Sequence, residues 1–113
     1  MKAAIAGGIF LTALASSAGA HEYPTIDRVE YVRVCMRDNP GPTHEMVYKC
    51  SCVIDAIAKD MSYEDYVDTS TAANAFTIGG QIGESVRDSE TIKKMAARFR
   101  EAQANAKKAC FVR

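Results

Sequence analysis

Four cysteines constrain the fold of this chain more than any other feature of its sequence. Cys50 and Cys52 are separated by a single residue and lie in the middle of an apolar segment with helical periodicity. Cys35 lies upstream of this segment, and Cys110 lies close to the end of the sequence. Two crosslinks that start from Cys50 and Cys52 would therefore attach both ends of a small folded chain to one central helix.

The N-terminal residues have the pattern of a secretory signal peptide. Met1-Lys2 supplies a positive charge, residues 3–15 are almost wholly apolar, and Ala18-Gly19-Ala20 has the small-residue pattern of a cleavage site. The apolar run is shorter than the roughly 18 residues that a bilayer requires, so we do not expect a membrane anchor. We predict that residues 1–20 are a signal peptide, that residues 21–113 form a single helical domain, and that the protein is soluble and exported to the periplasm.

Export favours disulfide bonds as the state of the four cysteines, because small exported proteins commonly rely on crosslinks. The Cys-x-Cys pair is not the C-x-x-C motif of redox proteins, and the sequence has no second cysteine pair to complete a zinc site. A ring that joined Cys50 to Cys52 would be very small and strained. Two pairings remain, namely Cys35–Cys50 with Cys52–Cys110, or Cys35–Cys52 with Cys50–Cys110.

Apolar periodicity predicts helices throughout residues 21–113 and no useful β-alternation. We expect a first helix at about 26–38, capped by Thr25 and ended by the Asn-Pro-Gly-Pro sequence at 39–42, and a second helix capped by Thr43. The predicted buried residues of the first helix are Ile26, Val29, Val32, Cys35 and Met36. Those of the second helix are Met46, Cys50, Val53, Ile54, Ile57 and Met61.

A third helix is expected to begin after Ser62, where Ser-Tyr-Glu-Asp is close to a capping box. Its predicted inward residues are Tyr63, Tyr66 and Val67. The glycine-rich residues 79–83 are expected to form a connecting loop.

Asp88 or Ser89 is the predicted cap of a long last helix that reaches Cys110. Its core-facing residues are expected to be Ile92, Met95, Phe99, Ala102, Ala106 and Cys110. The fold class that we predict is therefore all-α, a small disulfide-stapled bundle of about four helices.

The order of the helices favours one of the two disulfide pairings. In a hairpin that turns at residues 39–42, Cys35 lies closer to the level of Cys50 than to that of Cys52. Cys35 and Cys50 also share the predicted buried seam, whereas Cys52 points about 200° away from Cys50 around its helix. We therefore predict Cys35–Cys50 and Cys52–Cys110.

Charge is distributed unevenly along the chain. Residues 21–86 contain eleven acidic and five basic side chains, whereas residues 87–113 contain three acidic and eight basic ones. No aromatic residues interleave these cations in the manner of a single-strand binder, and we do not expect nucleic acid as a partner. The cations form either a solvated face that complements the acidic body or a docking surface for an acidic partner. The candidate docking residues are Lys93, Lys94, Arg98, Lys107 and Lys108.

Two groups of side chains are candidate metal ligands. Asp60, Glu64, Asp65 and Asp68 would suit a hard cation such as calcium or a lanthanide if their carboxylates converge. The alternatives are that the macrodipole of the third helix favours these acids or that the basic last helix neutralises them. His21 at the predicted mature N-terminus, together with His44, is a candidate copper site. A metal ion is the only cofactor that the sequence suggests.

Three segments carry a resemblance to a group of proteins. The segments Tyr-Lys-Cys-Ser-Cys-Val-Ile-Asp-Ala-Ile-Ala at 48–58, Ser-Tyr-Glu-Asp-Tyr at 62–66 and Lys-Lys-Ala-Cys-Phe at 107–111 are similar to small periplasmic four-cysteine helical proteins. That group is loosely associated with gene neighbourhoods of quinoprotein (PQQ-dependent) alcohol dehydrogenases. Because the shared residues are cysteines and core positions, the resemblance implies a fold and a setting and transfers no functional residue.

These observations favour an exported, non-enzymatic accessory protein, a crosslinked helical module that binds a periplasmic protein partner. No motif in the sequence indicates a catalytic residue, and disulfides would remove the free thiol that Cys/His catalysis needs. The alternative function is a periplasmic metal carrier or chaperone that uses the acidic cluster or the histidines. The sequence leaves the oligomeric state open.

Overall fold

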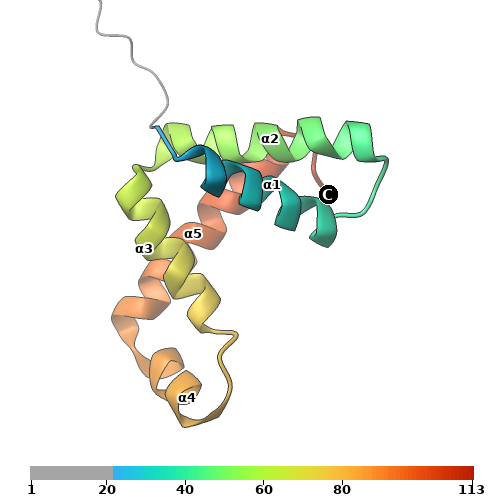
Figure 1. The fold of residues 1–113 in the computed structure, drawn as a ribbon. Helices are drawn as coiled ribbons and strands as arrows, with labels where there is room; N and C mark the ends of the chain where they lie inside the picture. Colours follow the sequence, from blue (N-terminus) through green and yellow to red (C-terminus); the bar gives the residue numbers. More distant parts are fainter. Residues whose placement is uncertain (1–21) are drawn as a thin grey trace, which may run out of the picture.

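The computed structural model describes residues 22–113, which form an all-α fold without strands (Figure 1). The predicted signal peptide and His21 lie outside the described residues. The described part of the chain contains five helices, namely α1 (Thr25–Asp38), α2 (Thr43–Asp60), α3 (Tyr63–Ala75), α4 (Gly80–Asp88) and α5 (Glu90–Ala109).

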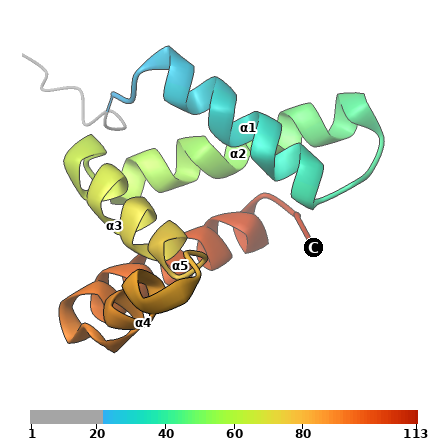
Figure 2. The same ribbon diagram turned by 60° about the horizontal axis from the view of Figure 1, so that its bottom comes forward.

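Two pairs of helices make up most of the structure. Helix α1 folds back on α2 as a hairpin, and α3 packs along α5 (Figure 1). The C-terminal half of α5 reaches α2, so the two pairs are joined through α2 and α5 (Figure 2). Short helix α4 packs mainly against α3 and α5 and lies at the end farthest from the hairpin (Figure 1).

Serine caps form at the two sites where the sequence predicts them. The Ser62 hydroxyl accepts a hydrogen bond from the Asp65 amide at 3.1 Å, and the Ser89 hydroxyl accepts one from the Ile92 amide at 3.4 Å. Each bond satisfies an amide that the first turn of the helix leaves unpaired.

Threonine caps were also predicted for α1 and α2, and this prediction is wrong. Thr25 and Thr43 are instead the first helical residues, and Pro24 and Pro42 occupy the cap positions without a side-chain bond. The carbonyl of Pro42 accepts the Met46 amide at 2.9 Å, so the helix starts one residue earlier than expected.

The hydrophobic core is centred on α2, as predicted. The expected stripe is buried in full, comprising Met46, Cys50, Val53, Ile54, Ile57 and Met61. It packs with Cys35 from α1, with Phe99 and Ala106 from α5, and with Cys110 at the end of α5. Helix α2 is therefore the central element of the molecule.

The disulfide bonds are Cys35–Cys50 and Cys52–Cys110, which confirms the predicted pairing. The Cα atoms are 5.9 Å apart in the first bond and 5.8 Å apart in the second. No cysteine in residues 22–113 is free. The first bond closes the α1–α2 hairpin, and the second joins the end of α5 to α2.

The predicted inward face of α1 is partly wrong. Ile26 is 71% exposed and Val29 is 56% exposed, whereas Tyr31 and Cys35 are buried. Helix α1 packs closely on α2 alone, so it buries a narrower stripe than a helix surrounded by several neighbours. Val67 of α3, which was also predicted to face inward, is exposed.

The loop predicted at residues 79–83 is mostly helical, because Gly79 is the N-cap of α4 and residues 80–83 form its first turn. Gly80 has a φ of +73°, which glycine adopts easily and which lets the chain turn into the helix. A Cβ atom at Gly83 would clash with the Ile78 carbonyl oxygen. Glycine is therefore required at position 83 because the two backbones lie too close together for a side chain. Arg87 donates to the same oxygen at 2.9 Å.

No helix within residues 22–113 combines the length and the apolar character that crossing a membrane requires.

Candidate functional site

The four candidate acidic ligands do not converge. Within residues 22–113, no three His, Cys, Asp or Glu side chains form a group that could hold a metal ion. Asp60 belongs to the end of α2, whereas the other three carboxylates belong to α3. Asp65 lies 3.0 Å from the Arg98 guanidinium of α5, so the last helix neutralises this acid, as the alternative prediction requires. Glu64 and Asp68 line a separate shallow hollow on α3.

The predicted histidine pair cannot be assembled from the described residues, because His21 lies outside them. His44 belongs to the first turn of α2 and packs edge-on against Tyr48, with 5.1 Å between the ring centroids. Its contacts are those of a surface aromatic pair.

The five candidate docking cations have different surroundings. Lys93 pairs with Glu90 in the same helix at 3.2 Å, and Arg98 pairs with Asp65. Lys94 is exposed near the start of α5, whereas Lys107 and Lys108 belong to its last turn. About 20 Å of helix separates the two ends at 1.5 Å per residue, so these cations do not form one surface.

The last turn of α5 ends in a Schellman motif. The Val112 amide donates to the Lys107 carbonyl at 2.9 Å, and the Phe111 amide donates to the Lys108 carbonyl at 3.4 Å. This pattern needs a left-handed residue directly after the cap, a position that is usually glycine. Here the residue is Phe111, with a φ of 60°, and it is the only non-glycine residue of positive φ in residues 22–113.

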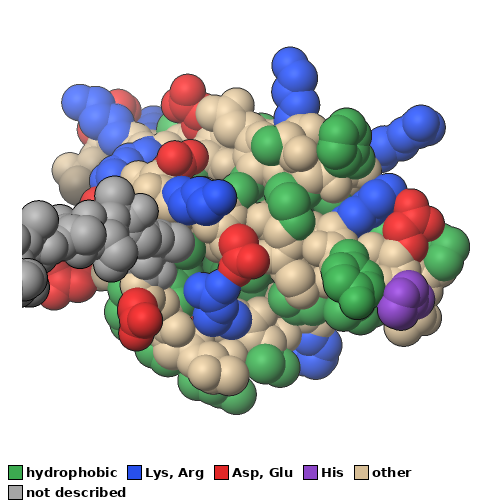
Figure 3. All heavy atoms as spheres, turned by 90° about the horizontal axis from the view of Figure 1, so that it is seen from above, with side chains coloured by type: hydrophobic (Ala, Val, Ile, Leu, Met, Phe, Trp, Pro, Cys, Tyr) green, Lys and Arg blue, Asp and Glu red, His purple; other side chains and the backbone are tan. Residues whose placement is uncertain are grey.

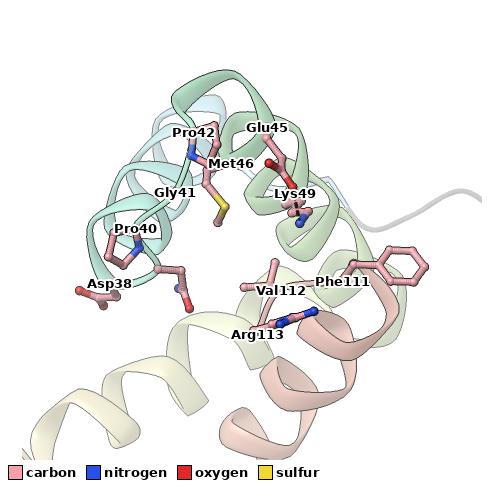
Figure 4. Close-up of a pocket in the computed structure, with 11 residues that line it drawn as sticks. Asp38, Pro40, Gly41, Pro42, Glu45, Met46, Lys49, Phe111, Val112 and Arg113 are labelled. Atoms are coloured by element: carbon pink, nitrogen blue, oxygen red, sulfur yellow. Dashed lines mark ion pairs between the residues drawn. The ribbon is translucent and has the colours of Figure 1, made fainter.

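The Phe111 side chain lies in solvent, with 79% of its surface exposed. Its two neighbours in sequence, Cys110 and Val112, are buried, so the chain is fixed on both sides of the exposed ring. Figure 4 shows the ring pointing away from the molecule while Val112 and Met46 point into a hollow beside it. The hollow has a volume of about 330 Å³ and is lined by 38–42, Glu45, Met46, Lys49 and 111–113.

Further apolar side chains are exposed on α2 near this hollow. Tyr48 is 67% exposed, and Val47 is also exposed. Lys49 and Glu45, which both line the hollow, form an ion pair at 2.7 Å. Hydrophobic side chains reach the surface among charged ones across the face that α1 and α2 form (Figure 3).

A second hollow of about 330 Å³ lies between α1 on one side and α3 and α5 on the other. Two hydrogen bonds bridge these walls. The Gln103 amide donates to the Tyr31 hydroxyl at 2.8 Å, and the Tyr63 hydroxyl donates to the Asp27 carboxylate at 2.7 Å. Burial, together with the nearby Tyr31 and Asp27, raises the pKa of Tyr66, which lines this cleft, to about 12.

No family model, curated protein or solved structure matches this chain.

The sequence reasoning overlooked Phe111, although a signal was present. Cys110 was expected to face the core at the end of the last helix, and it is buried at the C-cap of α5. The next residue therefore occupies the position where glycine usually ends a helix. A phenylalanine at that position is conspicuous. The residues that form the cleft also went unnoticed, because they come from three helices whose relative placement the sequence does not reveal.

Proposed function

We propose that this protein is an exported, non-enzymatic accessory protein that binds a periplasmic protein partner through the C-terminal end of α5. The observation that carries the proposal is Phe111, a large apolar side chain held in water by a left-handed backbone. The signal-peptide pattern and the two disulfides support export. Both disulfides also remove the thiolates that nucleophilic catalysis would use.

Stability alone gives no reason for phenylalanine at position 111. A left-handed conformation costs a residue other than glycine about 1–2 kcal/mol, and the exposed ring gains little burial in return. Strained residues that the surrounding structure holds in place are concentrated at binding sites. Aromatic side chains are enriched among the anchor residues of protein interfaces. The ring of Phe111 is therefore best explained as an anchor for a partner.

The surroundings of Phe111 indicate the chemistry of the partner. Lys107, Lys108 and Arg113 lie within four residues of the ring. An apolar anchor with a basic rim complements an apolar pocket with an acidic rim, because opposite potentials steer association and fix orientation. Of the predicted docking residues, this assignment retains Lys107 and Lys108. Lys93 and Arg98 instead form ion pairs within the protein.

The test is site-specific photo-crosslinking in the periplasm of producing cells. A photoreactive phenylalanine analogue at position 111 should crosslink to one defined protein, whereas the same analogue at Ile82, which is exposed on α4, should not. The purified partner should then bind the unmodified protein and lose at least about tenfold affinity for Phe111→Gly, since a hot-spot anchor contributes about 2 kcal/mol or more. Equal crosslinking from both positions, or full binding by Phe111→Gly, would contradict the proposal.

A further inference from the structure

The cleft between α1, α3 and α5 differs in character from the surface at Phe111. Helix α1 packs mainly on α2 and is tied to it by Cys35–Cys50, and side-chain hydrogen bonds link it across the cleft to α3 and α5. The cleft shares only Asp38 with the hollow beside Phe111. The lining residues that could contact a ligand through charge, ring or hydrogen bond include Asp27, Glu30, Tyr31 and Asp38 of α1, Tyr66 of α3 and Gln103 of α5.

The lining combines aromatic rings with carboxylates and contains no lysine or arginine from residues 22–113. The three acids differ in their own partners. Glu30 pairs with Arg33 and Asp38 pairs with Arg37, and both arginines lie outside the lining. Asp27 accepts a hydrogen bond from the neutral Tyr63 hydroxyl and forms no ion pair within the described chain. A positive charge in the cleft would therefore meet the Asp27 carboxylate as its nearest unpaired anion.

Tyr31 supplies an unused hydrogen-bond donor at the wall of the cleft. The residue is only 9% exposed. Its oxygen accepts from Gln103, and its own proton has no acceptor among residues 22–113. Because the Tyr31 hydroxyl borders the cleft and donates to no residue within 22–113, it is free to donate a hydrogen bond to an acceptor atom of a bound ligand.

We propose that the cleft binds a small organic ammonium ion that also carries a hydrogen-bond acceptor, such as an amino alcohol. The ammonium group donates to the Asp27 carboxylate and lies against the Tyr66 ring, since cations are attracted to aromatic faces. The acceptor atom of the ligand takes the proton of Tyr31. The cleft is at the lower end of the size range of ligand pockets, which suits a small molecule.

The test measures binding of 2-hydroxyethylammonium by NMR at constant ionic strength. Saturable shifts are expected at amides of α1, α3 and α5 that line the cleft and at the side-chain amide of Gln103. The neutral isostere ethylene glycol and the anion glycolate should produce no such shifts. Shifts from ethylene glycol equal to those from the ammonium ion would overturn the proposal, as would the lack of saturation below about 10 mM.

Two substitutions test the assigned roles while preserving the fold. Asp27→Asn retains an acceptor for Tyr63 but removes the charge, and it should weaken binding at least about tenfold. Tyr31→Phe retains the ring and should weaken binding about threefold to tenfold. Glu84→Gln on α4 is the matched control and should leave binding unchanged. Full affinity in Asp27→Asn would overturn the proposal, and if that variant did not fold, full affinity in Tyr31→Phe would do so.

Discussion

At the scale of single residues, buried tyrosines hold the N-terminal end of the described chain on the core. Tyr23 packs against Tyr63 and Tyr66, with ring centroids 5.6 and 4.8 Å apart. Its hydroxyl donates to the Met61 carbonyl at 2.8 Å. Burial, aided by Tyr66 and Asp65 and opposed by Arg28, raises the pKa of Tyr23 to about 12.

These raised pKa values predict that stability falls with alkaline pH. An unfolded tyrosine loses its proton near pH 10, whereas folded Tyr23 and Tyr66 keep theirs to about pH 12. Between these values the unfolded state binds fewer protons, so the free energy of unfolding should decrease as pH rises. The stability that the protonated forms of Tyr23 and Tyr66 contribute is fully present below pH 10 and is lost as the pH rises toward 12. Denaturant titrations of brief duration at several pH values should show the decrease, and its slope should be smaller in Tyr23→Phe. An equal slope in that variant would contradict the assignment.

Phe111 gives a prediction in which stability and binding change in opposite directions. Phe111→Gly removes the left-handed strain of about 1–2 kcal/mol, and the greater freedom of unfolded glycine offsets about 0.5–1 kcal/mol of that gain. The net increase should be about 1 kcal/mol, or about 4–8 °C in Tm. Thermal unfolding measures this change. Phe111→Ala is the control, because it removes the ring but keeps the strain, and its Tm should not rise.

At the scale of helices, α4 depends on the absence of a side chain at Gly83. A methyl group at Gly83 would clash with the Ile78 backbone carbonyl, which cannot move without displacing the turn before α4. We expect Gly83→Ala to destabilise this end of the molecule by about 1–3 kcal/mol, although alanine favours helices in general. Hydrogen exchange of the α4 amides should become faster. Gly79→Ala is the matched control, since open space surrounds that position, and it should be neutral or slightly stabilising.

Local signals in the sequence predicted most of the helices but not how the helices pack against one another. The serine caps, the stop at Asn39 and the α2 stripe depend on neighbours within a few residues, and all three are present in the structure. The exposure of Ile26 depends on how many helices pack around α1, which periodicity does not report. In the sequence, Gly83 cannot be distinguished from a loop glycine. Glycine is required there because of the close contact with the Ile78 backbone, which only the folded structure shows.

The candidate functional residues were less predictable than the fold for the same reason. The acidic cluster was proposed from spacing along the chain, yet Asp65 turns to Arg98 of a distant helix. The cleft combines Asp27, Tyr66 and Gln103, which lie far apart in sequence. Only the disulfide partners were predictable at long range, because four cysteines and one hairpin leave few pairings.

At the scale of the whole molecule, the two disulfides join different parts of the structure. Cys35–Cys50 spans 15 residues and fixes α1 on α2, whereas Cys52–Cys110 spans 58 residues and fixes the end of α5. In the chain-entropy model these rings contribute about 3 and 4 kcal/mol, respectively. Both values are large relative to the 5–15 kcal/mol that stabilises a typical domain. Reduction of both bonds should therefore bring the protein close to unfolding.

Removing the disulfides one at a time should separate the two proposed binding sites. The double substitution Cys52→Ala/Cys110→Ala frees the end of α5, so Phe111 loses the fixed backbone that presents its ring. It should lower the free energy of unfolding by about 4 kcal/mol and weaken partner binding more than ammonium binding. Cys35→Ala/Cys50→Ala should cost about 3 kcal/mol from ring opening and loosen α1, so ammonium binding should be affected more. Urea unfolding and the two binding measurements, made where each variant remains folded, check this reversal. If partner binding and ammonium binding weakened in the same ratio in both variants, the disulfides would support only overall stability and not the separate sites.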